Sequence, residues 1–364
     1  MCTRGFTVSE PGPAELRPRM LADVGGTNAR FAWQDGPDAP IGDVLTLPCA
    51  EHERLADAIT AYLGRAGRAA PRDCAIAIAN PVVGDLVQMT NHHWSFSIAG
   101  LKAQFGFERL RVLNDFTALA LALPTLKATE LRQVGGGAAA PGTAIGLIGP
   151  GTGLGVSGLL PDGAGGWAPL QGEGGHVTLA GRTPREHAVL AWIGSLHGHA
   201  SAERAVSGQG LVDIYRALGA LDAANEAPNA GGNNAAEETP RAAADEATRA
   251  ATAAAPGEID AASITHAALQ RGDARSAEAV NLMCAFLGTA AGNLALTLGA
   301  RGGVYIGGGI VPRLGDAFAR SPFRERFESK GRFSAFLGTI PVFVIHAEQS
   351  PALRGAASAL NRFA

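Results

Sequence analysis

Several sequence features that are typical of particular classes of protein are scarce or missing in this chain. The 364 residues include four cysteines, and these form no C-x-x-C pair. A disulfide framework and a structural zinc site are therefore not expected, and a reducing, cytoplasmic location fits this cysteine usage. The sequence also lacks Gly-Lys-Ser/Thr, which excludes a P-loop.

An excess of charge of one sign is lacking as well. The chain has 30 Lys and Arg against 33 Asp and Glu, which gives a formal net charge of −3. Binding to nucleic acid phosphates needs a clustered basic surface, so nucleic acid is not expected as a partner. Residues 1–19 contain no apolar segment of the kind found in signal peptides, and we expect a disordered tail there.

Two long uncharged stretches could be mistaken for membrane spans. Residues 133–161 contain Pro141, Pro150 and many glycines, which favours loops and a buried strand. Residues 279–300 carry Asn and Thr at several positions, so we expect a buried core helix. Within it, the spacing of Gly288 and Gly292 allows a second helix to pack closely. No membrane association is predicted.

Glycine, in contrast, is abundant. The 49 glycines are about twice the number expected from an average usage of ~7%. Many lie in three turns that each follow a predicted strand: Asp23-Val24-Gly25-Gly26-Thr27-Asn28, Gly149-x-Gly151-Thr152-Gly153-x-Gly155 and Gly307-Gly308-Gly309. Backbone N–H groups in such turns can hold phosphate oxygens, because no Cβ blocks their approach. One turn of this kind is most often only a turn, but three in this order favour phosphate binding.

The apolar pattern predicts short strands alternating with helices. Strands are expected as a pair within 21–33 and at 74–79, 109–113, 144–148 and 304–306, and helices at 53–68 and 116–123. Several strands end in Gly or Asp, which indicates an α/β fold with ligands at the strand ends. The match of Gly153-x-Gly155-x-x-Gly158 to a dinucleotide-binding fingerprint is discounted, because it continues into strand-like sequence. Residues 221–262 are rich in small and polar residues and read as an exposed insertion.

Two groups of polar residues could carry chemistry. Asp115 follows a predicted strand, where its carboxylate could accept the proton of an attacking hydroxyl or could cap the next helix. Glu173 and His176 lie three residues apart in a glycine-rich segment, and Glu203 adds a third polar group. Such side chains could bind several sugar hydroxyls or could be ordinary surface residues. A metal site is disfavoured, because no second His or Cys stands at ligand spacing.

Taken together, the motifs resemble those of the bacterial glucokinase family, within the actin/hexokinase/Hsp70 ATPase superfamily. The resemblance runs from about Met20 onward, and its specific stretches are Asp23-Val-Gly-Gly-Thr-Asn-Ala-Arg, Met89-Thr-Asn-His-His-Trp-Ser-Phe-Ser-Ile, Leu113-Asn-Asp-Phe-Thr-Ala, Gly149-x-Gly-Thr-Gly-Leu-Gly, Gly172-Glu-Gly-Gly-His-Val, Ser201-Ala-Glu-Arg and Gly307-Gly-Gly-Ile-Val-Pro-Arg.

This resemblance implies a fold and a domain organisation. The fold would be the two-domain ribonuclease H-like (actin/hexokinase) ATPase fold of the α/β class, with an active-site cleft between the domains. A small α/β domain would span 20–125 and be completed by 347–364. A large α/β domain would span 126–346 and carry the insertion at 221–262.

The resemblance also implies an activity and its residues. The activity is ATP-dependent phosphorylation of D-glucose to glucose 6-phosphate, the first step of glycolysis, with Asp115 as general base on the 6-hydroxyl. Asn114, Glu173, His176 and Glu203 would hold the other hydroxyls. ATP would be bound by a set of turn residues: Asp23, Val24, Gly25, Gly26, Thr27, Asn28, Gly151, Thr152, Gly153, Gly308 and Gly309. Asp23 would position Mg²⁺ through water, and the family implies a homodimer.

Three other functions are alternatives to this one. A kinase of the same fold could act on mannose or fructose, and the sequence does not decide between the sugars. A sugar-sensing regulator without turnover is disfavoured by the intact Asp115 and the complete phosphate turns. An actin-like assembly ATPase would leave Glu173, His176 and Glu203 unexplained. The zinc-binding cysteine cluster of the related repressor/kinase family is absent, which favours the zinc-free branch.

Overall fold

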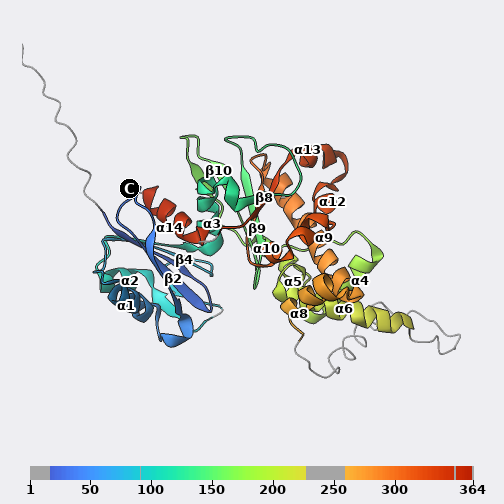
Figure 1. The fold of residues 1–364 in the computed structure, drawn as a ribbon, viewed down its shortest axis with the longest axis horizontal. Helices are drawn as coiled ribbons and strands as arrows, with labels where there is room; N and C mark the ends of the chain where they lie inside the picture. The colour runs from blue at the N-terminus through green and yellow to red at the C-terminus, as the bar shows by residue number, and fades with distance from the viewer. Residues whose placement is uncertain (1–16, 91, 227–258, 348–349, 363–364) are drawn as a thin grey trace, which may run out of the picture. The chain divides into compact units, whose positions relative to one another are not determined.

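The computed structural model describes residues 17–90, 92–226, 259–347 and 350–362 (Figure 1). The chain divides into two compact units, Met1–Pro124 with Ser350–Ala364 (unit 1) and Thr125–Gln349 (unit 2). From the sequence, the small domain is expected to end at residue 125 and to resume at residue 347. Most of the expected tail and of the expected insertion, residues 1–16 and 227–258, lies outside the described residues.

Unit 1 is built on a five-stranded sheet in the order β3-β2-β1-β4-β7. Its strands are β1 (Arg19–Val24), β2 (Asn28–Gln34), β3 (Gly42–Pro48), β4 (Asp73–Ile78) and β7 (Arg109–Asn114). Strands β1, β4 and β7 run parallel, and the register aligns Val24 with Ile78 and Ile78 with Asn114. The carboxyl ends of three strands therefore meet at one edge of this sheet, the place where ligands bind in open α/β sheets.

Successive side chains of β1 lie on opposite faces of this sheet. Met20, Ala22 and Val24 belong to a buried cluster with residues of helix α1 (Leu55–Ala66). Leu21 belongs to another cluster with Leu353 of helix α14 (Pro351–Asn361). Because both faces are covered, the strand is apolar along most of its length instead of alternating. The remaining elements of unit 1 are η1 (Cys49–Glu51), β5 (Leu86–Gln88), β6 (Ser95–Ser97), α2 (Ile98–Phe105) and α3 (Asp115–Ala122).

Unit 2 contains a six-stranded sheet in the order β11-β10-β9-β12-β13-β8. The strands are β8 (Leu131–Gln133), β9 (Ile145–Pro150), β10 (Leu154–Pro161), β11 (Trp167–Pro169), β12 (Val304–Ile306) and β13 (Val342–Ile345). The helices are α4 (Pro184–His197), α5 (Ala202–Ala205), α6 (Gly208–Glu226), α8 (Ala261–His266), α9 (Ala274–Leu298), α10 (Ile310–Leu314), α11 (Asp316–Arg320), α12 (Phe323–Glu328) and α13 (Ser334–Thr339). Short helical turns η2 (Leu123–Thr125), η3 (Ala128–Glu130), η4 (Gly174–His176), η5 (Ala267–Arg271) and η6 (Gly331–Phe333) complete the chain.

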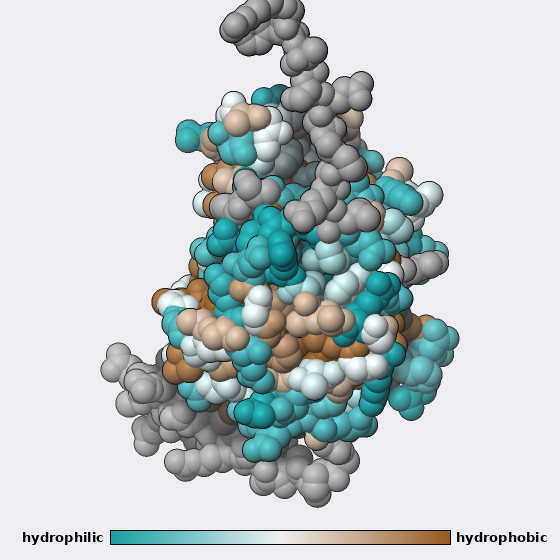
Figure 2. All heavy atoms as spheres, turned by 90° about the vertical axis from the view of Figure 1, so that its left-hand side faces the viewer, coloured by the Kyte–Doolittle hydropathy of each residue, from teal (hydrophilic) through white to brown (hydrophobic). Residues whose placement is uncertain are grey.

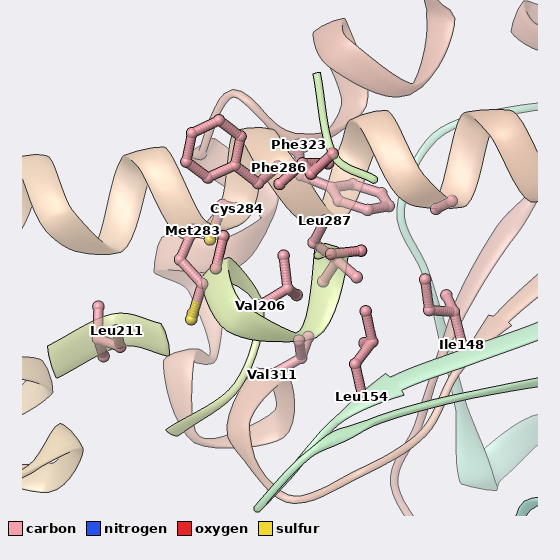
Figure 3. Packing of buried hydrophobic residues seen from close by; sticks show 14 of the residues in the cluster. Ile148, Leu154, Val206, Leu211, Met283, Cys284, Phe286, Leu287, Val311 and Phe323 are labelled. Atoms are coloured by element: carbon pink, nitrogen blue, oxygen red, sulfur yellow. The ribbon is translucent and has the colours of Figure 1, made fainter. Parts of the chain in front are cut away.

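Helix α9 is the central helix of the core of unit 2. Figure 3 shows Phe286 and Leu287 of this helix close to Phe323, with Val206, Val311 and other apolar side chains packed nearby. Among the described residues, α9 is the one helix long and apolar enough to cross a membrane, and 67% of its most apolar window is buried inside the protein. Core helices of soluble proteins pass the same test.

The expected close packing against α9 is confirmed. A Cβ at Gly288 would overlap the carbonyl of Phe323, and a Cβ at Gly292 would overlap the carbonyl of Phe327. Both carbonyls belong to α12. The two glycines, one helical turn apart, therefore let the backbones of the two helices approach.

Three predicted boundaries are wrong. The tail was expected to reach residue 19, but Arg17 donates a hydrogen bond to Glu108 (2.7 Å) and the buried Arg19 donates one to Asn361 (2.7 Å). The insertion was expected to begin at residue 221 and end at 262, but α6 continues to Glu226 and α8 begins at Ala261. Ion pairing and helix propagation thus order residues whose local composition is polar.

The exposed surface mixes polar and apolar side chains. On the face in Figure 2, a group of apolar residues is bordered by hydrophilic ones. The large apolar residues with the greatest exposure are Val83 (85%) and Leu86 (63%) in unit 1. Singly exposed apolar side chains of this kind are normal on globular proteins.

Candidate active site

The first predicted phosphate turn joins β1 to β2 in unit 1. Its chain reverses tightly, with the N–H of Gly25 donating to the carbonyl of Asn28 at 2.9 Å. Val24 is fully buried, so it presents no accessible atoms to a ligand. The turn borders a pocket of about 250 Å³ lined by Asp23, Gly25, Gly26, Thr27, Asn28 and Arg30. Five of the six residues predicted to bind ATP from this turn thus surround one cavity.

Asp23 stands at the end of β1 with one carboxylate oxygen already engaged. Its Oδ2 accepts a hydrogen bond from Arg30 Nη1 (3.2 Å) and another from Ser350 Oγ (2.6 Å). Neither partner was identified from the sequence. Arg30 lies within the motif Asp23–Arg30 and could have been found there, whereas the position of Ser350 carries no local signal.

Asn114 and Asp115 lie where β7 passes directly into α3. Asn114 is the N-cap of the helix, and its Oδ1 accepts from the N–H groups of Phe116 (2.9 Å) and Thr117 (3.1 Å). Its Nδ2 donates to Asp115 Oδ1 at 3.0 Å. The alternative interpretation, in which Asp115 caps the helix, is therefore wrong, because Asn114 occupies the cap position and Asp115 is the first helical residue.

The environment of Asp115 perturbs the ionisation of its carboxyl. Burial raises the pKa of the Asp115 carboxyl to about 6, the hydrogen bond from the N–H of Phe116 opposes this rise, and the Asp23 carboxylate adds to it. A carboxylate with a pKa near the working pH combines sufficient basicity with the correct protonation state. The geometry thus permits Asp115 to act as a general base.

A further polar residue at this sheet edge is not among the predicted site residues. Asn80 follows β4 and is nearly buried, with 8% of its surface exposed. Its Oδ1 accepts from the N–H of Thr90 (3.1 Å), and its carbonyl accepts from Asn114 Nδ2 at 3.5 Å. The sequence signal was present, because Asn80 precedes Pro81 at a strand end, but it indicated only that the strand stops there.

The second and third predicted phosphate turns come together in unit 2. The second turn connects β9 to β10, and the N–H of Gly151 donates to the carbonyl of Gly153 at 2.8 Å. The third follows β12, the parallel neighbour of β9, and the N–H of Gly307 donates to the carbonyl of Ile148 at 2.9 Å. At Gly308 a Cβ would overlap the carbonyl of Pro150, so the two turns touch. Since Leu154 begins a strand, the dinucleotide fingerprint is excluded, as predicted.

Glu173, His176 and Glu203 form one cluster, also in unit 2. His176 Nδ1 lies 3.9 Å from Glu173 Oε2, and His176 Nε2 lies 3.6 Å from Glu203 Oε1. His176 and Glu173 are more than half exposed, whereas Glu203 is 26% exposed. Side chains from η4, from the residue before it and from α5 thus place carboxylate and imidazole groups on one accessible patch. Such a patch can accept and donate several hydrogen bonds to a polyhydroxylated ligand.

Comparisons with known proteins identify what the chain is similar to. The glucokinase family profile matches residues 20–363. The chain is 50% identical to the glucokinase of Aromatoleum aromaticum over 351 residues, 96% of each chain. It is 50% identical to that of Chromobacterium violaceum over 349 residues, 96% of this chain and 91% of that one. A crystal structure of a glucokinase from an Antarctic psychrotroph is similar with a TM-score of 0.78 and 33% identity, covering 96% of this chain and all of that chain.

Proposed function

We propose a mechanism from the premise that the chain belongs to the glucokinase family. The activity is transfer of a phosphoryl group from ATP to D-glucose, and the fold is the actin/hexokinase type of ATPase. The observation that carries the mechanism is Asp115, a carboxylate held at the start of α3 with a pKa raised to about 6. It would remove the proton of the glucose 6-hydroxyl as that oxygen attacks the γ-phosphorus.

The remaining hydroxyls are assigned to two sets of residues. In unit 1, Asn114 lies beside the base and holds Asp115 Oδ1 through its amide. In unit 2, the cluster of Glu173, His176 and Glu203 supplies carboxylates and an imidazole. A buried or half-buried group that is left unpaired by the wrong sugar costs free energy, and this would favour glucose over sugars that differ at one hydroxyl.

The phosphates of ATP are assigned to the glycine-rich turns. The amides of the turn after β1 border the pocket beside Asp23, and those of Gly151, Thr152 and Gly153 lie in the turn after β9. Gly308 and Gly309 would lie beside the adenosine. Backbone amides fixed in such turns stabilise negative charge without a cost of reorganisation in the transition state.

Asp23 fits a role in holding Mg²⁺ through water. Mg²⁺ usually keeps several of its waters and takes one or two protein carboxylates together with substrate phosphates. Asp23 offers one carboxylate at the edge of the phosphate pocket, and Arg30 and Ser350 fix its orientation. When bound, Mg²⁺ would neutralise charge on the ATP phosphates.

A cytoplasmic homodimer is also proposed. The cysteines among the described residues, Cys49, Cys74 and Cys284, are buried and form no disulfide, in keeping with a reducing compartment. The dimer is proposed from the family resemblance, without nucleic acid or membrane partners. Light scattering coupled to size-exclusion chromatography would test it, and a mass near 37.1 kDa would contradict it.

The proposed function is tested by a coupled assay of the purified chain with Mg-ATP and four sugars: glucose, mannose, fructose and N-acetylglucosamine. Turnover on glucose with little on the others is expected. Preferred turnover on mannose or fructose would keep the mechanism and change the substrate. Tight glucose binding without turnover on any sugar would instead favour a sugar-sensing regulator.

A further inference from the structure

We propose that the turn between β9 and β10, assigned above to the phosphates of ATP, also positions the carboxylate of Glu203 for the sugar. Gly153 would then set the affinity for glucose before any nucleotide binds. The inference rests on the proposed function, because it takes Glu203 as a ligand of glucose. It gives the turn a second role that its phosphate-binding sequence does not indicate.

The two oxygens of Glu203 have different partners. Oε2 accepts a hydrogen bond from the backbone N–H of Leu154, the first residue of β10, at 2.9 Å. Oε1 faces the imidazole of His176, whose Nε2 lies 3.6 Å away. One oxygen is thus held by the end of the turn, and the other remains on the side of the sugar cluster. A hydrogen bond from a backbone N–H to a carboxylate is among the stronger ones, so it fixes the carboxylate plane.

Gly153 is small because the carboxylate takes the space of its side chain. A Cβ built at Gly153 would overlap Oε2 of Glu203 and lie 3.2 Å from its carboxyl carbon. The backbone of Gly153 is not in the left-handed region, so its conformation would accept other residues. A side chain at residue 153 would therefore displace the Glu203 carboxylate, whereas the turn geometry itself would accept it.

Gly151, two residues earlier in the same motif, has no such contact. A Cβ there would meet nothing within 4 Å in unit 2, and its φ is also outside the left-handed region. The two glycines of one phosphate motif thus differ in what their side-chain positions face. This difference supplies a matched pair of substitutions.

The donor to Glu203 is fixed by the core of unit 2. The side chain of Leu154 is buried and belongs to the same cluster as Ala202 and Ala205, which flank Glu203 in α5. Figure 3 shows Leu154 and Val206, the residue after α5, among the packed side chains. Since close-packed side chains transmit displacement, the N–H of Leu154 and the backbone of Glu203 keep a defined separation.

Sugar and nucleotide binding are expected to influence each other through this contact. Glucose at Oε1 and phosphates at the turn would both act on one hydrogen-bonded unit, the Glu203 carboxylate and the N–H of Leu154. An effect of one ligand on the affinity for the other must be reciprocal. Glucose should therefore tighten the binding of a non-hydrolysable ATP analogue, and removal of the contact should reduce this effect.

The first experiment measures glucose affinity by calorimetry with no nucleotide present. Gly153→Ala should weaken glucose binding by roughly tenfold to a hundredfold, the range for losing a hydrogen bond to a charged group. Gly151→Ala should change nucleotide-free glucose affinity by less than about twofold, although it weakens binding of the ATP analogue. If Gly153→Ala leaves glucose affinity unchanged while the unaltered protein turns over normally, this inference is overturned and the proposed function stands.

A double-mutant cycle shows whether Glu203 carries the effect. In the Glu203→Ala background the space at residue 153 is open, so adding Gly153→Ala should cost no further glucose affinity. Thermal unfolding of the unaltered protein, the two single variants and the double variant gives a second measurement, which does not require glucose binding. Gly153→Ala should lower Tm with Glu203 present and leave it unchanged with Ala at 203. Equal losses in both backgrounds would overturn the inference. Absence of glucose binding and turnover in the unaltered protein would contradict the proposed function as well.

Discussion

The hydroxyl of Ser350 donates a 2.6 Å hydrogen bond to Oδ2 of Asp23, across 327 positions of the chain. Ser350 occupies the N-cap position of α14, yet its side chain makes no cap hydrogen bond to that helix. Arg30 donates to the same oxygen of Asp23 at 3.2 Å. The start of the last helix of the chain thus helps to orient the carboxylate beside the first phosphate turn.

Ser350→Ala tests this contact. Loss of one hydrogen bond to a partly exposed carboxylate should raise KM for Mg-ATP about three- to tenfold. Glucose KM should stay nearly unchanged, because Asp23 is not assigned to the sugar. Calorimetric titration with a Mg-bound ATP analogue gives a measure independent of turnover. Ser358→Ala is the control, since that hydroxyl bonds only its own helix, at the carbonyl of Arg354. An equal rise of both KM values would contradict the assignment.

Asp115→Ala should lower kcat by about 10²–10⁴-fold or more, the contribution of a general base. Glucose binding measured by calorimetry should survive, because the other hydroxyl ligands remain. Asp115→Asn is the matched variant, since its amide oxygen can still accept from the N–H of Phe116 and only the basicity is lost. A near-normal rate in either variant would rule out Asp115 as the base.

The raised pKa of Asp115 predicts opposite effects of pH on activity and on stability. Because the base must be ionised, kcat/KM should rise with pH and level off above about 6. In the folded state this carboxyl keeps its proton up to about pH 6, whereas its ordinary pKa is 3.8. Folding stability should therefore fall as pH rises between these two values, and it stays reduced above them.

Asp115→Asn should accordingly raise the free energy of unfolding near pH 7.5, by about 1–3 kcal/mol. The gain should disappear below pH 4, where the native carboxyl is protonated in both states. Denaturant unfolding at the two pH values gives the measurement. Equal stability of the two proteins at pH 7.5 would show that burial does not raise this pKa.

Glu173→Gln should weaken glucose affinity by about tenfold, because a carboxylate makes stronger hydrogen bonds to hydroxyls than an amide does. Affinity for the ATP analogue should change little. Glu325→Gln, at an exposed glutamate of α12 in the same unit, is the control for loss of one negative charge. Unchanged glucose affinity in Glu173→Gln would remove this residue from the sugar site.

Local sequence pointed to those parts of the candidate site that depend on neighbouring residues. The three glycine turns, the Asn114–Asp115 junction and the cluster around His176 were all identified, because each lies in a short motif at a strand end or in a loop. The contacts from Ser350 to Asp23 and from Leu154 to Glu203 were not. Both join residues far apart in sequence, and they are created by the packing of α14 onto the sheet of unit 1 and of α5 into the core of unit 2.

The prediction of element boundaries was wrong where the local sequence carries little information on secondary structure. Residues 221–226 have few large apolar side chains, yet they continue α6, whose earlier turns are anchored in the core by Leu211 and Leu218. Once a helix is nucleated, adding a residue costs little, so composition alone places its end too early. Likewise Arg19 is buried because Asn361 and the carbonyl of Ala357 accept its hydrogen bonds.

The buried ion pair of Glu186 and Arg326 supports the last prediction. Arg326 donates through two nitrogens to the two carboxylate oxygens, at 2.6 and 2.7 Å, and both side chains are less than a tenth exposed. Burial raises the pKa of Glu186, but the hydrogen bonds from Arg326 and from the N–H of Arg182 outweigh it and hold the pKa below its ordinary 4.5. The pair therefore contributes stability above pH 4.5 that is lost as pH falls.

Glu186→Gln should lower the free energy of unfolding at pH 7 by about 3–5 kcal/mol, because it leaves the Arg326 charge buried without its partner. Glu325→Gln removes the exposed partner of Arg182 and should cost at most about 1 kcal/mol. Below pH 4.5 this carboxyl takes up a proton when the protein unfolds, so the difference between Glu186→Gln and the unaltered protein should shrink as pH falls. Urea unfolding at pH 7 and at pH 3.5 measures both effects. A difference that is the same at the two pH values would show that size and shape at residue 186, and not charge, stabilise the packing of α4 against α12.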